Sequence, residues 1–256
     1  MQELRTEDAA NEAVPVVAVQ ISLPQPTAPD VRGPSASVDA EEGRAMKVID
    51  CLQGSPEWKA ARVGIPTASE FARLVTNTIK DGEYKLSTSL PGYAAELAAE
   101  LFAGKSLKDF DGNTWMDRGK EKEAEAVALY EFTTDATVTR VGFITTDDGL
   151  CGCSPDALVG DDGGLEVKCN KAETHVEIVG YHKKHGHAPV KYTQQVQVCL
   201  WITGRKHWDQ LFYHPDLPPL TVRQVPDPLQ HAAFAKAVAA VIAERDQQLA
   251  TLRSQT

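Results

Sequence analysis

A glycine-rich turn between two short apolar segments is the feature that most constrains this chain. Residues 154–168 read SPDALVGDDGGLEVK, in which two apolar segments flank three glycines and two aspartates. Such a turn closes a β-hairpin. Because side chains alternate between the two faces of a strand, Glu166 and Lys168 are expected on one face and their aliphatic neighbours on the other. The hairpin would also bring Asp156, at the start of its first strand, beside Glu166.

Two neighbouring carboxylates followed by a lysine suggest metal-dependent chemistry. Carboxylates placed together repel each other unless a cation lies between them, and hard oxygen ligands suit Mg²⁺ or Mn²⁺. Asp156 precedes Glu166-x-Lys168 by ten residues, which is a layout that a metal-dependent phosphodiesterase needs. A surface hairpin with ordinary charges is the alternative. The spacing alone leaves both interpretations open, because short motifs match by chance.

Composition favours one globular domain preceded by a tail. The 256 residues are 42% hydrophobic, which is enough for a sizeable core. Residues 1–46 combine several prolines with three Arg against eight Asp and Glu, and so hold half of the net charge of −10. We therefore expect residues 1–46 to form a disordered, acidic, proline-rich tail and residues 47–256 to form the folded domain.

The sequence gives no sign of a membrane partner or of secretion. No apolar run approaches the ~20 residues that cross a bilayer, and the N-terminus lacks the pattern of a signal peptide. The five cysteines form no disulfide framework. We expect a cytoplasmic protein. The acidic net charge excludes little about nucleic acids, because an enzyme that moves along DNA needs only a basic track.

A possible anion site precedes the hairpin in the sequence. Thr67 and Glu70 form a capping-box pattern, which predicts a helix that starts at Ala68 and carries Ser69 in its first turn. Backbone N–H groups at a helix N-terminus bind anions, and Arg62 could add a guanidinium. The alternative is a plain capped helix with a surface arginine, and the local sequence favours that alternative.

Two polar residues interrupt apolar helical stripes. A predicted helix over residues 117–131 places Glu123 on an apolar stripe, where a carboxylate is costly unless it is paired or bound to a metal. Glu123 could instead lie at the edge of that stripe with its carboxylate in water. A second predicted helix, over residues 192–203, places Gln195 among apolar side chains. The stripe around Glu123 consists of Met116, Gly119, Val127 and Tyr130.

The remaining segments are assigned from periodicity and turn residues. Residues 181–189 hold three His and read as a polar, basic loop that either faces DNA or is merely solvated, since no rigid element fixes the geometry of a metal site. We further expect loops at 80–89 and 109–115, helices at 55–62, 91–103 and 228–252, strands at 137–145 and 207–213, and proline-rich turns after residue 213.

Four motifs in order along the chain resemble the phage lambda exonuclease family, also called YqaJ-type viral recombinases, within the PD-(D/E)xK nuclease superfamily. One such motif would be weak evidence, but four collinear motifs are strong. The resemblance covers about residues 55–213. The motifs are Glu57-Trp58-x-x-x-Arg62-x-Gly64-x-x-Thr67-Ala68-Ser69, Gly119-Lys120-x-x-Glu123, Ser154-Pro155-Asp156 with Gly164-Leu165-Glu166-Val167-Lys168-Cys169, and Tyr192-x-x-Gln195-Val196-Gln197.

The resemblance implies a role for each candidate residue. Asp156 and Glu166 would bind two Mg²⁺ ions, which Mn²⁺ can replace, with Glu123 and the backbone carbonyl of Val167 completing the sites. Lys168 would position and activate the attacking water. The residues that match positions holding the terminal 5′-phosphate of DNA are Arg62, Ser69, Ser154 and Gln195. The chain departs from the family where Asn170 replaces a frequent proline, and the adjacent Gln194 leaves the assignment of Gln195 open.

The same resemblance implies an α/β fold of the restriction-endonuclease type, with a mixed central sheet flanked by helices. It implies a 5′→3′ exonuclease that digests one strand of duplex DNA and leaves a 3′ overhang for recombination. It also implies a ring-shaped homotrimer, a single-strand annealing protein as partner, and a phage or prophage gene expressed in a bacterial cytoplasm. The rivals are a restriction-like endonuclease and a non-catalytic DNA-binding adaptor. Intact Asp156, Glu166 and Lys168 argue against the adaptor.

Overall fold

The computed structural model describes residues 46–108 and 114–255, with the backbone alone for residues 114–120. The expected tail lies outside the described residues except for Met46, which begins strand β1 (Met46–Ile49). Met116 and Gly119, which were expected beside Glu123, are also outside the described side chains. Among the described helices, none is both long enough and apolar enough to cross a membrane.

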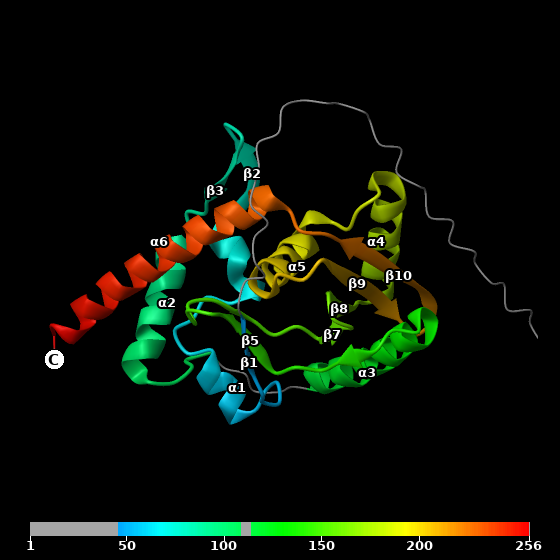
Figure 1. Ribbon diagram of the computed structural model, residues 1–256, viewed down its shortest axis with the longest axis horizontal. Helices are drawn as coiled ribbons and strands as arrows, with labels where there is room; N and C mark the ends of the chain where they lie inside the picture. Colours follow the sequence, from blue (N-terminus) through cyan, green and yellow to red (C-terminus); the bar gives the residue numbers. More distant parts are fainter. Residues whose placement is uncertain (1–45, 109–113, 256) are drawn as a thin grey trace, which may run out of the picture. The chain divides into compact units, whose positions relative to one another are not determined.

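A five-stranded mixed sheet forms the centre of the domain (Figure 1). Its strand order is β10-β9-β8-β7-β4, and β8 and β9 are parallel while the other neighbours are antiparallel. The expected hairpin is β7 and β8, which pair in the register Ala157↔Leu165. The strands are β4 (Val138–Thr139), β7 (Ala157–Val159), β8 (Gly163–Cys169), β9 (His207–His214) and β10 (Leu217–Gln224).

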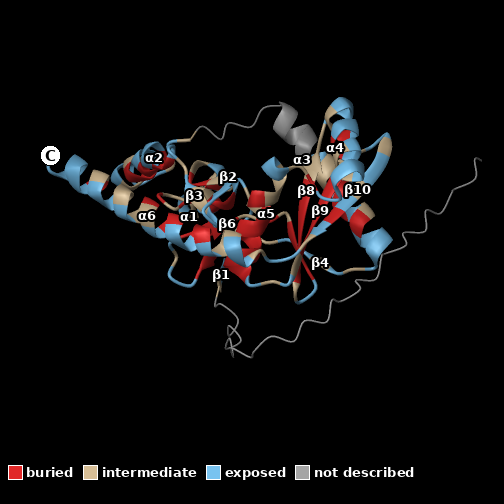
Figure 2. Cartoon of the chain, turned by 90° about the horizontal axis from the view of Figure 1, so that it is seen from above, coloured by how far each residue is buried: buried red, intermediate tan, exposed pale blue. Residues whose placement is uncertain are grey.

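Helices cover the sheet and confirm the expected mixed α/β class. Leu165 and Val167 pack against α3 (Thr114–Thr134) in one apolar cluster. Glu166 and Lys168 contact Gln195 of α5 (Val190–Thr203) instead. The two faces of β8 are therefore divided as the alternation predicts. Helix α4 (Ala172–His185) packs on β9, and Figure 2 shows β8 and β9 as largely buried.

A second group of elements packs around α5 and supplies the rest of the core. A three-stranded sheet has the order β1-β5-β6. In the core of this group, the aromatic rings of Phe71, Trp201 and Phe234 contact one another, with 5.2 Å between the centroids of Phe71 and Phe234. The elements are α1 (Pro56–Ala61), the 3₁₀ helix η1 (Ala68–Arg73), β2 (Val75–Lys80), β3 (Glu83–Leu86), α2 (Leu90–Ala103), β5 (Phe143–Thr146), β6 (Gly152–Cys153) and α6 (Pro228–Arg253).

Four local expectations were wrong. The loop predicted from residue 181 begins inside α4, which continues to His185 and ends at Gly186. The loop at 80–89 is partly strand, since β2 and β3 form a hairpin. Pro215 lies in the turn between β9 and β10, as expected, but Pro218 and Pro219 lie within β10, an edge strand, where missing N–H groups are tolerated. The single strand at 137–145 is split between β4 and β5, which belong to different sheets, and between them Gly142 passes so close to Cys51 that a side chain would collide with the Cys51 carbonyl.

Candidate active site

The hairpin brings Asp156 next to Glu166. Oδ2 of Asp156 accepts a 2.6 Å hydrogen bond from the backbone N–H of Val167, the residue after Glu166. Burial, followed by the charges of Glu166 and Glu123, raises the pKa of Asp156 well above its ordinary value. Burial also raises the pKa of Glu166, whose side chain is 3% exposed. Two carboxylates are thus held together where their charges are costly.

One carboxylate oxygen of Glu166 accepts two hydrogen bonds and the other accepts none. Lys168 Nζ and Gln195 Nε2 each donate to Glu166 Oε1 at 2.7 Å, and Lys168 Nζ also donates to Gln195 Oε1 at 3.3 Å. Burial opposes the charge on Lys168, but the Glu166 carboxylate outweighs that effect and raises the pKa of the ammonium. Oε2 of Glu166 is buried without a hydrogen-bond partner. A buried carboxylate oxygen without a partner is costly, so it calls for a cation or water.

The carboxylates fit a divalent cation only in part. The unpartnered Glu166 Oε2 beside Asp156 provides the hard oxygen donors that Mg²⁺ or Mn²⁺ prefers. Glu123 is close enough to raise the pKa values of both, but its Oε1 is paired with Arg140 Nη1 at 3.3 Å. Within the part of the chain that the structure describes, no group of three or more His, Cys, Asp or Glu is arranged to hold a metal. Glu123 would have to turn from Arg140 to join a metal site.

A second polar site surrounds Arg62, the residue that ends α1. Arg62 Nη1 donates to Ser154 Oγ at 3.1 Å, and its guanidinium lies 4.1 Å from the centroid of the Trp58 ring. Trp58 Nε1 donates to the same Ser154 oxygen at 2.8 Å. Burial lowers the pKa of Arg62, and no carboxylate of the described residues lies within 4.0 Å of its guanidinium. A largely buried guanidinium without a carboxylate partner suits an anion.

Ser69 is not joined to this site. The helix starts at Ala68 as predicted, but it is η1, a six-residue 3₁₀ helix, and Ser69 is exposed on it. Among the described residues, Thr67 and Glu70 do not form the expected capping box. Thr67 makes no side-chain cap and instead accepts a 3.4 Å hydrogen bond from Arg62 Nη2. The candidate anion site therefore consists of Arg62 and Ser154 and does not include a helix N-terminus.

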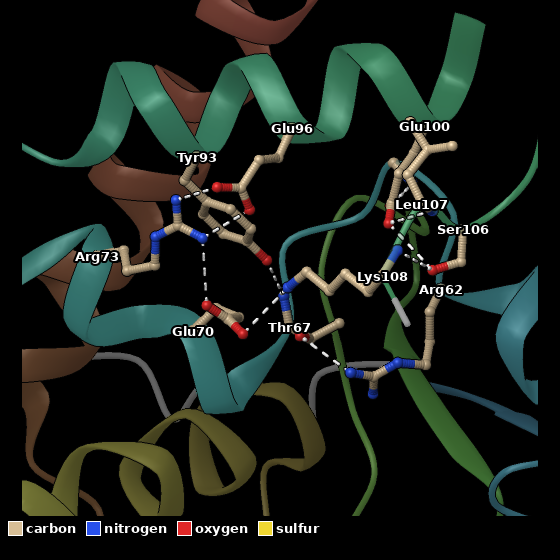
Figure 3. A network of polar contacts seen from close by, with 11 residues as sticks. Arg62, Thr67, Glu70, Arg73, Tyr93, Glu96, Glu100, Ser106, Leu107 and Lys108 are labelled. Atoms are coloured by element: carbon tan, nitrogen blue, oxygen red, sulfur yellow. Dashed lines mark hydrogen bonds and ion pairs between the residues drawn. The ribbon is translucent and has the colours of Figure 1, made fainter. Parts of the chain in front are cut away.

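A polar network holds the segments beside Arg62 (Figure 3). Glu100 on α2 is buried and accepts hydrogen bonds from the N–H groups of Gly64 and Leu107 and from Ser106 Oγ. Sequence patterns did not indicate this network, because its contacts join separate segments. A pocket next to it is lined by Arg62, Ile65, Thr67, Tyr93, Glu96, Leu97, Glu100, Ser106 and Lys108.

Comparisons with known proteins show the family of the chain. A model of the YqaJ-like viral recombinase domain matches residues 57–206. The chain belongs to the YqaJ-like viral recombinase family. It is 32% identical to the alkaline exonuclease LHK-Exo from Laribacter hongkongensis, with a TM-score of 0.66, over 78% of this chain and 97% of that one. LHK-Exo has also been crystallised in complex with dAMP.

A more distant structure shares the fold alone. The phage-related exonuclease from Haemophilus somnus 129PT is 17% identical, with a TM-score of 0.55, over 73% of this chain and 96% of that one. No curated protein matches the chain. The YqaJ-like match ends at residue 206 and so includes every candidate site residue. Elements beyond it still support the site region, since Arg245 of α6 donates to the Gly64 carbonyl at 2.7 Å.

Trp58 is the residue next to the site that sequence reasoning did not single out as functional. Its spacing of four residues from Arg62 on one helix was a usable signal, because side chains at i and i+4 meet on a helical surface. Its bond to Ser154 spans 96 positions, which no local pattern reveals.

Proposed function

We propose that this YqaJ-like domain is a Mg²⁺-dependent 5′→3′ exonuclease. It would digest one strand of linear duplex DNA and leave a 3′ single-stranded overhang for recombination by strand annealing. The observation that carries the proposal is the link between the two sites. Ser154, which Arg62 contacts, is two residues before Asp156, which contacts Val167 beside Glu166. A pocket for a terminal phosphate next to a pair of carboxylates suits cutting from an end.

The residues divide the chemistry between them. Asp156 and Glu166 would hold the divalent cation, and Glu123 and the Val167 carbonyl would complete its ligands. A bound divalent ion would stabilise charge on the phosphoryl group and make water a better nucleophile. The Lys168 ammonium, held at 2.7 Å from Glu166, would position the water and offset negative charge in the transition state. Gln195, bonded to both Glu166 and Lys168, would keep their orientation.

Arg62 would fix where the cut occurs. A guanidinium that binds the terminal 5′-phosphate, together with Ser154, sets the register of the strand relative to Asp156. Ser69 remains part of the proposal only if DNA changes the position of η1, because Ser69 is exposed and outside the hydrogen bonds around Arg62. The relatives support this reading, since LHK-Exo is named an alkaline exonuclease and one of its structures contains dAMP, a deoxynucleoside monophosphate.

One digestion assay tests the proposal against its enzymatic rival. The purified protein is given linear duplexes with either a 5′-phosphate or a 5′-hydroxyl and a closed circular duplex, with Mg²⁺ or with EDTA. We expect shortening of the phosphorylated linear strand in Mg²⁺ alone. Cutting of the closed circle would favour a restriction-like endonuclease, and no Mg²⁺-dependent loss of any substrate would favour a non-catalytic adaptor.

The family resemblance also supports a homotrimeric ring and a single-strand annealing partner as parts of the proposal. Light scattering of the purified chain tests the first. A mass of three chains is expected, and a monomer at all concentrations would contradict it. The second is tested with a single-strand annealing protein encoded by a gene next to the gene for this chain. The immobilised domain should retain that protein.

A further inference from the structure

A basic and aromatic surface lies where α4 ends and α5 begins. We call it the α4–α5 corner and define it by Tyr181, Lys183, Lys184, His185, His187 and Lys191. Residues 180–192 contain three Lys, three His and no Asp or Glu, in a chain whose net charge is −10. All of the corner residues except the half-buried Tyr181 are exposed. A local positive surface on an acidic protein points to an anionic partner.

Three rings of the corner, those of the half-buried Tyr181 and the exposed His185 and His187, form a cluster. The centroids of Tyr181 and His185 are 4.3 Å apart with an interplanar angle of 34°, and His187 lies 5.5 Å from Tyr181 and 6.0 Å from His185. The metal alternative fails here, because no group of three or more metal-binding side chains in the described ranges could hold an ion. Clustered rings that reach solvent are platforms on which bases can stack.

The helix dipole accounts for only part of the positive charge. Lys183, Lys184 and His185 are in the last turn of α4, where cations are favourable. Lys191 is in the first turn of α5, where the same dipole makes a cation unfavourable. The dipole therefore does not account for Lys191, whose Nζ lies 4.8 Å from the centroid of the neighbouring Tyr192 ring.

The corner continues from the active site along α5. Lys191 precedes Gln195 by four residues, so the two share a helical face about 6 Å apart along the axis. Gln195 contacts Glu166 and Lys168. The start of α5 is held in place, because Gln210 Nε2 donates to the Tyr192 carbonyl at 2.6 Å and the Tyr192 ring packs 5.3 Å from that of Phe212. The corner is thus a fixed extension of the site.

We propose that the α4–α5 corner binds single-stranded DNA next to the position of cutting. Its lysines would contact successive phosphates and its ring cluster would stack on unpaired bases. Single-stranded DNA is favoured over duplex, because paired bases are already stacked on one another and cannot cover the rings of Tyr181 and His185. The inference rests on the proposed function, since digestion of one strand of a duplex is what produces a single strand at this place.

The test measures binding in EDTA, where no cutting occurs. Fluorescence anisotropy follows a labelled single-stranded oligonucleotide and a duplex of the same length over a range of salt concentrations. The variants are Lys183→Ala/Lys184→Ala/Lys191→Ala and His185→Ala/His187→Ala. The control is Lys206→Ala/Lys236→Ala, which removes exposed lysines that pair with Asp162 and Glu83 away from the corner. Unchanged melting temperatures verify that the variants are folded.

The lysine variant should reduce the salt slope of single-strand binding by about 2, since each phosphate contact contributes about 0.7. The histidine variant should weaken single-strand binding by about 5- to 100-fold and leave duplex binding near that of the parent. The control should match the parent. Equal losses for single strand and duplex, unchanged binding, or no single-strand binding by the parent would overturn the inference. A failure of the proposed function appears separately, as absence of Mg²⁺-dependent digestion.

Discussion

Gln195 donates a 2.7 Å hydrogen bond from Nε2 to Oε1 of Glu166. Its neighbour Gln194 points elsewhere, since Nε2 of Gln194 donates to the buried carbonyl of Val75 at 3.0 Å. The two adjacent glutamines therefore belong to different parts of the molecule. The sequence alone left open which of them contacts the candidate site. Gln195 is in the candidate site and Gln194 is in the core.

Replacement of the two glutamines should separate activity from stability. Gln194→Ala leaves the Val75 carbonyl without its partner and should lower the free energy of unfolding by about 1–3 kcal/mol. Gln195→Ala removes the hydrogen bonds to the charged groups of Glu166 and Lys168 and should lower kcat/KM by about 10- to 100-fold with little change in stability. Denaturant unfolding and single-strand digestion measure the two effects. A similar loss of activity per folded molecule in both variants would contradict the assignment.

Lys168→Ala should abolish cutting while DNA binding remains. The ammonium contacts Glu166 and Gln195, so its removal takes away the group that positions water and offsets charge in the transition state. We expect a fall in kcat of about 100-fold or more. Binding to a 5′-phosphorylated duplex in Ca²⁺ and single-turnover digestion in Mg²⁺ provide the two readouts, with Lys206→Ala as the control. Digestion at the parent rate would show that Lys168 has another role.

Sequence patterns predicted the helices and strands that short stretches of sequence determine. The β7–β8 hairpin followed from the glycine-rich turn and from strand alternation. The helix predicted to end at residue 203 does end there, where Gly204 has the left-handed φ of 64° that favours a helix end. From the sequence, Glu123 was either an acid paired or bound to a metal on an apolar stripe or a residue at the edge of that stripe. The sequence did not predict that the partner is Arg140, which lies 17 positions away across two elements.

The errors arose where tertiary contacts outweigh local composition. The His- and Lys-rich end of α4 reads as a loop, but buried His175 and Ile178 hold the helix to its neighbours. Thr67 occupies the predicted N-cap position of η1, but its hydroxyl accepts a hydrogen bond from Arg62 and makes no side-chain cap. The pairing of Arg62 with Ser154 spans 92 positions, so it becomes visible only when the fold is known or when a family motif links the two segments.

Arg62→Ala should erase the preference for a phosphorylated end. The guanidinium is the cation that contacts Ser154, and its loss removes the charge that would bind the terminal phosphate. The ratio of digestion rates for 5′-phosphate and 5′-hydroxyl duplexes should fall by about 10-fold or more, the effect of losing a charge-assisted hydrogen bond. Lys206→Ala is the control, because Lys206 is exposed and paired with Asp162 rather than with a residue around Arg62. An unchanged ratio in Arg62→Ala would remove the phosphate pocket.

Divalent cations should stabilise the domain increasingly as the pH rises. The pKa of Asp156 is raised in the folded state by burial and by Glu166 and Glu123. The stability that the protonated Asp156 carboxyl contributes is therefore fully present below the ordinary pKa of an Asp. It is lost as the pH rises through the raised pKa. A cation that replaces the proton restores the loss, so the increase in melting temperature in Mg²⁺ over EDTA should grow from about pH 5 to about pH 8. Glu166→Gln should reduce this increase, and an increase independent of both pH and Glu166 would contradict cation binding at this pair.

Asp209→Asn should destabilise the domain at neutral pH and much less in acid. Asp209 of β9 accepts hydrogen bonds from Tyr130 Oη of α3 at 2.6 Å and from Arg223 of β10 at 2.8 Å, and so ties the helix that carries Glu123 to the sheet. Burial opposes its charge, but these hydrogen bonds outweigh burial and lower its pKa. The stability that the carboxylate contributes is therefore present above the ordinary pKa of an Asp and is lost as the pH falls through the lowered value. The difference in unfolding free energy between parent and variant should be about 1–3 kcal/mol near neutral pH and should shrink towards about pH 3. A difference that stays constant over this range would show that shape rather than charge matters at Asp209.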